Sequence, residues 1–157
     1  MVLSSREIER YLDGRLIEIS PFDKELQLQK NSVDIRISNR YHRYPREIEV
    51  ELEMLDPKNP YLTFLEQDYI SENGAVIEAK KFFIVESLEY IKVPEDICIY
   101  IQPKFRLSRM GLHIVNAGLI EAGFEGNIEI CLYNANEIPV RIFPEMRICH
   151  IFFQKVV

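Results

Sequence analysis

Three cationic side chains lie close together in the stretch PKFRLSRMG, residues 103–111: Lys104, Arg106 and Arg109. They follow the strand-like run ICIYIQ, although the chain as a whole carries a formal net charge of −6 at pH 7. Positive charge gathered in an acidic protein is compatible with the binding of a small anion. A solvated loop without a ligand is the alternative, and the residues alone leave both interpretations open.

A glycine-rich stretch, AGLIEAGFEG at residues 117–126, is the second candidate. Its glycines flank Glu121 and Phe124, and this spacing suits a tight hairpin that brings the backbone close to a ligand. A plain β-hairpin with an exposed glutamate is the alternative. A carboxylate at such a bend is nevertheless a candidate functional residue.

The run that follows alternates between apolar and polar residues over 127–133, which predicts a strand with one buried face. The buried face is expected to hold Ile128, Ile130 and Leu132. The opposite face is semi-polar and carries Asn127, Glu129, Cys131 and Tyr133. Glu129 and Cys131 are therefore predicted to point to the same side as any ligand bound there.

The clearest helix signal is at the start of the chain. Ser4 and Glu7 have the spacing of a capping box, an apolar stripe follows, and Gly14 stands where a C-terminal cap belongs. We expect a helix from about 5 to 13.

Most of the remaining chain has a two-residue period or short apolar runs, with prolines between them. The runs are SVDIRIS (32–38), EIEVELEML (47–55), KKFFIVESLEYI (80–91), DICIYIQ (96–102), NIEICLY (127–133) and RICHIFF (147–153). Many short strands favour a mostly β protein, a sandwich or barrel with a short N-terminal helix. Residues 56–73 predict a loop with a helical turn. The length of 157 residues predicts one domain, 1–157.

Several functional classes are disfavoured by composition. Three cysteines without a C-x-x-C pair indicate reduced thiols, and no apolar run approaches the ~18 residues of a membrane span, so we expect a cytoplasmic protein. The excess of acidic over basic residues argues against a nucleic-acid partner. The three histidines have no metal-ligand spacing with the cysteines, and zinc-deaminase, Walker and dinucleotide motifs are missing.

Almost the whole chain resembles the trimeric dCTP deaminases and their dUTPase relatives. The matching segments, in family order, are LSSREIERYLDGRLIEISPF, NSVDIRIS with Asp34 in place, VPEDICIYIQPKFRLSRMGL, AGLIEAGFEGNIEICLYN and IPVRIFPEMRICHIFF. The N-terminal helix places the chain closer to the deaminase branch. The resemblance implies a jelly-roll-like β fold and a homotrimer with sites between subunits.

The resemblance also implies roles for the candidate residues. Lys104, Arg106 and Arg109 match the loop beside the triphosphate, where Arg109 is retained unchanged. Glu121 matches an aspartate that contacts the sugar in deaminases and activates water in dUTPases, and Phe124 matches the aromatic residue on the deoxyribose. The ligand implied is dCTP or dUTP, with Mg²⁺ carried by its phosphates.

Two substitutions depart from the family pattern. Phe105 replaces a serine that helps to hold the attacking water, and Cys131, in the nucleotide site, replaces the glutamate that acts as general base. Glu129 is on the same face about 7 Å away, too far for a direct exchange unless the strand slips or bulges. Deaminases also continue beyond FFQKVV into a tail that closes over the triphosphate, so we expect no lid from this chain.

Two functions therefore remain open from the sequence. One is an enzyme of weak or altered activity, which deaminates dCTP or hydrolyses dUTP with Glu121, and tentatively Glu129, as catalytic residues. The other is a catalytically silent relative that binds a nucleotide or a protein and acts as a regulator.

Overall fold

The computed structural model describes residues 1–45, 55–58 and 65–157. The predicted strand EIEVELEML at 47–55 therefore lies, except for its last residue, outside the described residues. The N-terminal helix is confirmed as α1 (Ser5–Asp13), where the Ser4 hydroxyl accepts a hydrogen bond from the Glu7 amide and the Gly14 amide donates to the Arg10 carbonyl.

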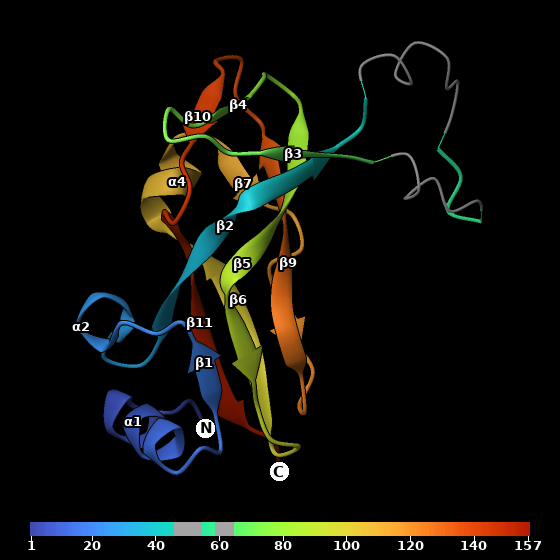
Figure 1. Ribbon diagram of the computed structural model, residues 1–157. Coiled ribbons are helices and arrows are strands. Elements are labelled where there is room, and N and C mark those ends of the chain that lie inside the picture. Colours follow the sequence, from blue (N-terminus) through green and yellow to red (C-terminus); the bar gives the residue numbers. More distant parts are fainter. Residues whose placement is uncertain (46–54, 59–64) are drawn as a thin grey trace.

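The protein is mostly β, as predicted, and its strands form one large curled sheet and a small two-stranded one (Figure 1). The large sheet has the order β7-β9-β5-β2-β11-β6-β8, with β1 added on β5 and β3 on β2, and β10 pairs with β4. The bounds are β1 (Glu18–Ser20), β2 (Val33–Arg43), β3 (Glu66–Tyr69), β4 (Ala75–Ile77), β5 (Phe82–Lys92), β6 (Ile97–Pro103), β7 (Leu112–Ile114), β8 (Leu119–Ile120), β9 (Glu125–Asn134), β10 (Val140–Ile142) and β11 (Arg147–Lys155).

The two ends of this sheet order, β7 and β8, are consecutive in the chain and are joined by only four residues, 115–118. A connection this short requires the two edges to approach each other, so the sheet curls into a half-barrel. The concave side holds the core, to which successive strands contribute alternate residues. The largest side chains without exposed surface include Ile35, Ile37, Ile91, Ile97, Ile99, Ile130 and Phe153.

Two short helices complete the described fold: α2 (Lys24–Gln27) and α4 (Phe105–Arg109). The cationic stretch predicted as a loop is thus a helical turn, held by the amides of Leu107 and Ser108, which donate to the Lys104 carbonyl. The expected loop at 56–73 also contains a strand, β3, which pairs with β2. Residues 59–64 of that stretch lie outside the described part.

The glycine-rich stretch is not a simple hairpin. β8 pairs with β6, whereas β9 pairs with β5 and β7, so the strands on either side of 121–124 have different neighbours. Sequence spacing indicated the bend correctly but not its partners, because those partners come from distant parts of the chain.

Candidate functional site

Lys104 connects three elements at the start of α4. Its amide donates to the Ile148 carbonyl of β11, its carbonyl accepts the first hydrogen bonds of α4, and its ammonium group lies 2.5 Å from the Asp34 carboxylate of β2. This contact engages the side chain inside the protein. The resemblance implied a place for Lys104 beside a triphosphate, and within the described chain its ammonium group pairs with a buried carboxylate.

Arg106 and Arg109 take no part in this contact, and both are exposed. Within the described residues neither makes an ion pair, and the Arg109 guanidinium lies 6.0 Å from the centre of the Phe105 ring. Phe105 is itself 75% exposed, while Leu107 of the same turn is buried in the core. The turn is therefore anchored through Leu107 and presents two uncommitted arginines and a phenyl ring on its outer side.

Asp34 has no exposed surface, although it stands on the polar face of β2. One of its oxygens contacts Lys104 and, at 3.1 Å, Arg147; the other lies 2.8 Å from Nδ1 of His150. Helix α2 borders the cluster, because Arg147 also donates to the Leu26 carbonyl. A buried carboxylate with three such partners is fully satisfied, as a buried charge must be.

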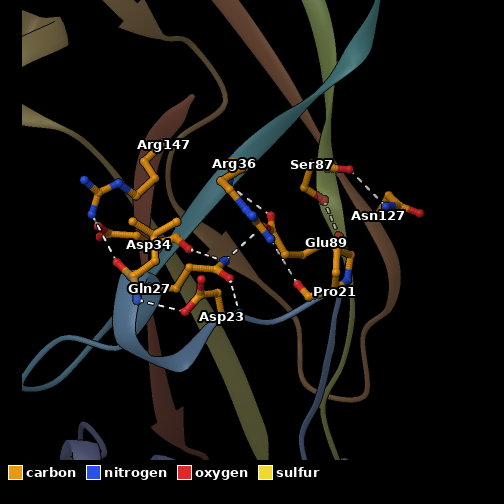
Figure 2. Close-up of polar contacts among 10 residues, drawn as sticks. Pro21, Asp23, Gln27, Asp34, Arg36, Ser87, Glu89, Asn127 and Arg147 are labelled. Carbon is orange, nitrogen blue, oxygen red and sulfur yellow. Dashed lines mark hydrogen bonds and ion pairs between the residues drawn. The ribbon is translucent and has the colours of Figure 1, made fainter. Parts of the chain in front are cut away.

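A second buried carboxylate, Glu89, lies on the adjacent strand β5 (Figure 2). It accepts hydrogen bonds from the Arg36 amide at 3.0 Å and side chain at 2.6 Å, and from the Gln27 amide group at 2.9 Å. Gln27 also donates to the Asp34 carbonyl, so α2 ties the two carboxylate clusters together. The network spans β2, β5, β11 and α4.

The bend at 121–124 lies near the start of β6, at the opposite end of this strand from α4. The Gly123 amide donates to the Pro94 carbonyl and the Phe124 carbonyl accepts from the Val93 amide. Gly123 has a φ of 78°, a backbone conformation that favours glycine, and a Cβ there would lie 2.9 Å from the Glu95 carboxylate, which would have to move aside. Glu121 is exposed, and Phe124 packs partly against the core.

The semi-polar face of β9 is as predicted: Ile128, Ile130 and Leu132 are buried, and the intervening side chains are exposed or half-buried. Asn116 fixes the backbone there, since its side chain donates to the Glu129 carbonyl and accepts from the Cys131 amide. Partial burial, with the nearby Glu129 carboxylate, raises the pKa of the Cys131 thiol. At neutral pH this thiol keeps its proton and cannot take one from water.

Glu129 does not reach the position of Cys131. Pairing between β5 and β9 is regular from Phe82 opposite Tyr133 to Glu86 opposite Glu129. The register shift follows on β5, where the four-residue step from Glu86 to Tyr90 opposes a two-residue step on β9. Because β9 itself stays regular, the slip that would bring Glu129 into register is not observed.

Within one chain, the predicted site residues lie near the two opposite ends of strand β6. β8 runs antiparallel to β6, with Ile120 opposite Ile99, so Glu121 continues toward the start of β6, whereas Lys104 follows its last residue, Pro103. At 3.3 Å per residue, the bend and α4 are about 20 Å apart. A single chain therefore does not bring Arg109 together with Glu121 and Phe124.

Three residues of this region were not singled out from the sequence: Asn116, Arg147 and Glu89. Arg147 and Glu89 pair with Asp34 and Arg36 across 113 and 53 positions of the chain, so these pairs leave no local signal in the sequence. Only the pairing of β2 with β5 and β11 reveals them.

The described residues bring together no group of three or more His, Cys, Asp or Glu side chains suited to a metal ion. Among the same residues, no helix has the length and apolarity needed to cross a membrane.

Solved structures identify the fold. The deaminase of 2'-deoxycytidine 5'-triphosphate from Agrobacterium tumefaciens superposes with a TM-score of 0.75 at 19% identity, over 97% of this chain and 46% of that one, so this chain spans about half of its length. The dUTPase of a Staphylococcus bacteriophage, 80alpha, superposes with a TM-score of 0.56 at 14% identity, over 90% of this chain and 83% of that one. The half-barrel is thus the fold shared by dCTP deaminases and dUTPases.

The chain belongs to the dCTP deaminase-like family, whose model matches residues 2–156. Similar curated proteins are named "dCTP deaminase, dUMP-forming". Those from Sulfurihydrogenibium sp. and Persephonella marina are 40% and 39% identical over 157 residues, which is 99% of this chain and 84% of each relative. The family predicted from the five motifs is confirmed.

Proposed function

We propose that the protein binds a deoxypyrimidine nucleoside triphosphate, dCTP or dUTP, in a site completed by a second copy of the chain. The observation that carries this proposal is the separation of α4 from the bend at 121–124 by the length of β6. Arg106 and Arg109 are uncommitted cations at one end, and Glu121 and Phe124 are exposed or half-exposed at the other. A symmetric trimer can bring the two ends together between neighbouring copies.

In such a site the arginines would hold the triphosphate, because a guanidinium group can donate to two phosphate oxygens at once. Mg²⁺ would arrive with the nucleotide and offset the charge of its phosphates. Phe124 would pack on the deoxyribose. Glu121 would orient the sugar or, in dUTP hydrolysis, accept a proton from the water that attacks the α-phosphate, releasing dUMP and diphosphate.

Deamination of dCTP is expected to be slow. Attack of water at the amino-bearing carbon of cytosine requires a base that takes a proton from water and returns it to the leaving ammonia. Cys131 is neutral at pH 7 because its pKa is raised, and Glu129 stays two residues away from it on a regularly paired stretch of β9. Loss of such proton transfer typically lowers the rate by about 10²- to 10⁴-fold.

A second candidate function, a catalytically silent regulator that still binds nucleotide or protein, is favoured by Phe105. Its exposed ring stands where the family has a serine that helps to hold the attacking water. A phenyl ring makes no hydrogen bond to that water, so binding could persist without turnover.

Turnover assays separate these functions. The protein is incubated with dCTP and with dUTP, each with and without Mg²⁺, and products are separated by chromatography. We expect dUTP to be converted to dUMP more readily than dCTP is deaminated, and the double variant Cys131→Glu with Phe105→Ser to gain deaminase activity. Deamination of dCTP by the unmodified protein at about 1 s⁻¹ or faster would contradict the assignment. Binding without any turnover would favour the regulator.

Complementation tests the shared site. Arg109→Ala and Glu121→Ala chains, each impaired in binding, are mixed, unfolded and refolded together. If each site combines α4 of one copy with the bend of another, about a quarter of the sites in the mixed trimers contain both native residues. Calorimetric titration with dCTP should recover that fraction. No recovery above the separate variants would contradict a site between copies.

A further inference from the structure

We infer that Asp34 is a positioning residue for the nucleotide site, and that Lys104 acts with it as the anchor of α4 rather than as a phosphate ligand. The inference rests on the proposed function, since it assigns α4 the role of presenting Arg106 and Arg109 to the triphosphate. It concerns how that turn is held in place.

The geometry of the carboxylate carries the first step. Asp34 is wholly buried, and its Oδ2 receives both Lys104 at 2.5 Å and Arg147 at 3.1 Å. His150 occupies the other oxygen. Lys104 retains only 22% of its side-chain exposure. An ammonium group so placed would have to leave a buried, charge-assisted contact in order to reach a phosphate.

The backbone of Lys104 carries the second step. The residue is the N-cap of α4, yet its side chain makes no capping hydrogen bond, so the start of the turn depends on where Lys104 is held. Its amide is fixed to Ile148 and its carbonyl to Leu107. The ion pair between the Lys104 side chain and Asp34 is a third contact, and together the three contacts set the direction in which α4 leaves β6.

The far end of the turn is also tied. Asn136 donates to the Met110 carbonyl and the Ala135 amide donates to the Gly111 carbonyl. Between these two ends, Arg106 and Arg109 have no ion-pair partner among the described residues. Helix α4 is therefore held at both of its ends while its two exposed arginines remain without ion pairs among the described residues. Asp34 is the buried residue that holds its start.

Removing the charge of Asp34 tests the inference, because the two explanations predict opposite changes in the dissociation constant for nucleotide. If electrostatics alone mattered, replacing a negative charge near a triphosphate site by a neutral group would tighten binding or leave it unchanged. If Asp34 positions α4, then Asp34→Asn should weaken dUTP binding, because the asparagine amide cannot accept from all three neighbours. We expect a dissociation constant at least about fivefold higher. An unchanged or lower constant overturns the inference.

Hydrogen exchange of the protein without nucleotide gives a readout independent of the proposed function. Asp34→Asn should speed exchange of the amides of 104–111 by at least about fivefold, while α1 and β5 stay protected. Asp13→Asn, which removes the same charge at the exposed end of α1, should leave exchange at 104–111 unchanged. Unchanged exchange at 104–111 overturns the inference even if nucleotide binding is lost.

A second pair of variants covers failure of Asp34→Asn to fold. Lys104→Gln leaves Asp34 with Arg147 and His150, so the fold should survive while exchange at 104–111 rises. Lys104→Arg keeps the ion pair and should restore protection. If Lys104→Gln and Lys104→Arg protect the turn equally, the anchor is refuted. If the wild-type protein binds neither dCTP nor dUTP, the proposed function fails, and the exchange measurements still decide the anchor.

Discussion

Glu89 and Glu86 lie three positions apart on β5 and have opposite environments. Glu89 has no exposed surface and contacts Arg36, whose side chain is only 13% exposed. Glu86 pairs with Arg40 at 3.6 Å, and each of these side chains is about half exposed to solvent. The two glutamates therefore form a natural comparison between a buried and a surface ion pair.

Glu89→Gln is expected to lower the free energy of unfolding by about 3 kcal/mol or more, because a buried arginine is left without its counter-charge. Glu86→Gln should change it by less than about 1 kcal/mol. Urea denaturation, with the slope of the transition checked for constancy, measures both. Equal effects of the two substitutions would mean that the Glu89 network contributes no more than a surface pair.

Burial gives Cys149 a pH-dependent role in stability. Loss of solvation raises the pKa of its thiol from 9.0 to about 12. Since the folded-state pKa is raised, the stabilisation is present below about pH 9 and is lost as pH rises from there toward 12. From about pH 8.5 the free energy of unfolding should therefore decline, by about 0.7 kcal/mol per pH unit at pH 9 and by close to about 1.4 kcal/mol per pH unit above pH 10.

Cys149→Ala should flatten this decline even if it lowers stability at neutral pH by leaving a small cavity. Cys131→Ala is the matched control, because that thiol is only partly buried and should account for less of the slope. The Tyr90 phenol, whose pKa is raised to about 12 from 10.0, titrates in the same direction but enters at higher pH. An unchanged slope in Cys149→Ala would refute the assignment.

Arg109 is exposed and has no ion-pair partner among the described residues. Arg109→Ala should weaken triphosphate binding by about 1.5–3 kcal/mol, the range for hydrogen bonds to charged groups, with no loss of fold. Titration calorimetry measures the change, and Arg6→Ala, at the exposed start of α1, is the control. If Arg109→Ala and the unmodified protein bind the triphosphate with equal affinity, Arg109 does not contact the phosphates and α4 is only a solvated turn.

At the scale of elements, the sequence predicts best where the signal is local. The capped helix α1 and the alternating strand β9 were both expected within one or two residues of their bounds, because capping and strand periodicity act between near neighbours. The turn α4 was missed since five residues are too few to show helical periodicity. The neighbours of β8 and β9 were missed because strand pairing joins distant segments.

The bend between these strands depends on Gly123. Gly123→Ala places a Cβ against the Glu95 carboxylate at a φ of 78° and is expected to cost at least about 1–2 kcal/mol of stability. Gly14→Ala, at a φ of −77°, should cost less. Thermal unfolding of the two variants compares them, and a larger loss for Gly14→Ala would show that the bend tolerates a side chain.

At the scale of the whole molecule, we propose that residues 1–157 form one domain and that the domain assembles as a trimer. Among the described residues, all of the buried hydrophobic side chains except Ile84 and Cys98 belong to one continuous cluster, which supports a single cooperative unit. Calorimetry should show one unfolding transition whose midpoint rises with protein concentration, because assembly stabilises the folded chain. Light scattering should give three times the mass of the chain. A stable monomer at micromolar concentration would contradict the trimer and remove the shared site.

The position of β11 has a consequence for synthesis on the ribosome. It follows every other strand in the chain, yet it pairs with β2 on one side and β6 on the other. Until residues 147–155 emerge, the nascent chain holds two unsatisfied strand edges in the middle of its future sheet, open to pairing with other chains. Completion of the large sheet must therefore wait for the last strand, and chains stalled before Arg147 should be the ones that chaperones retain.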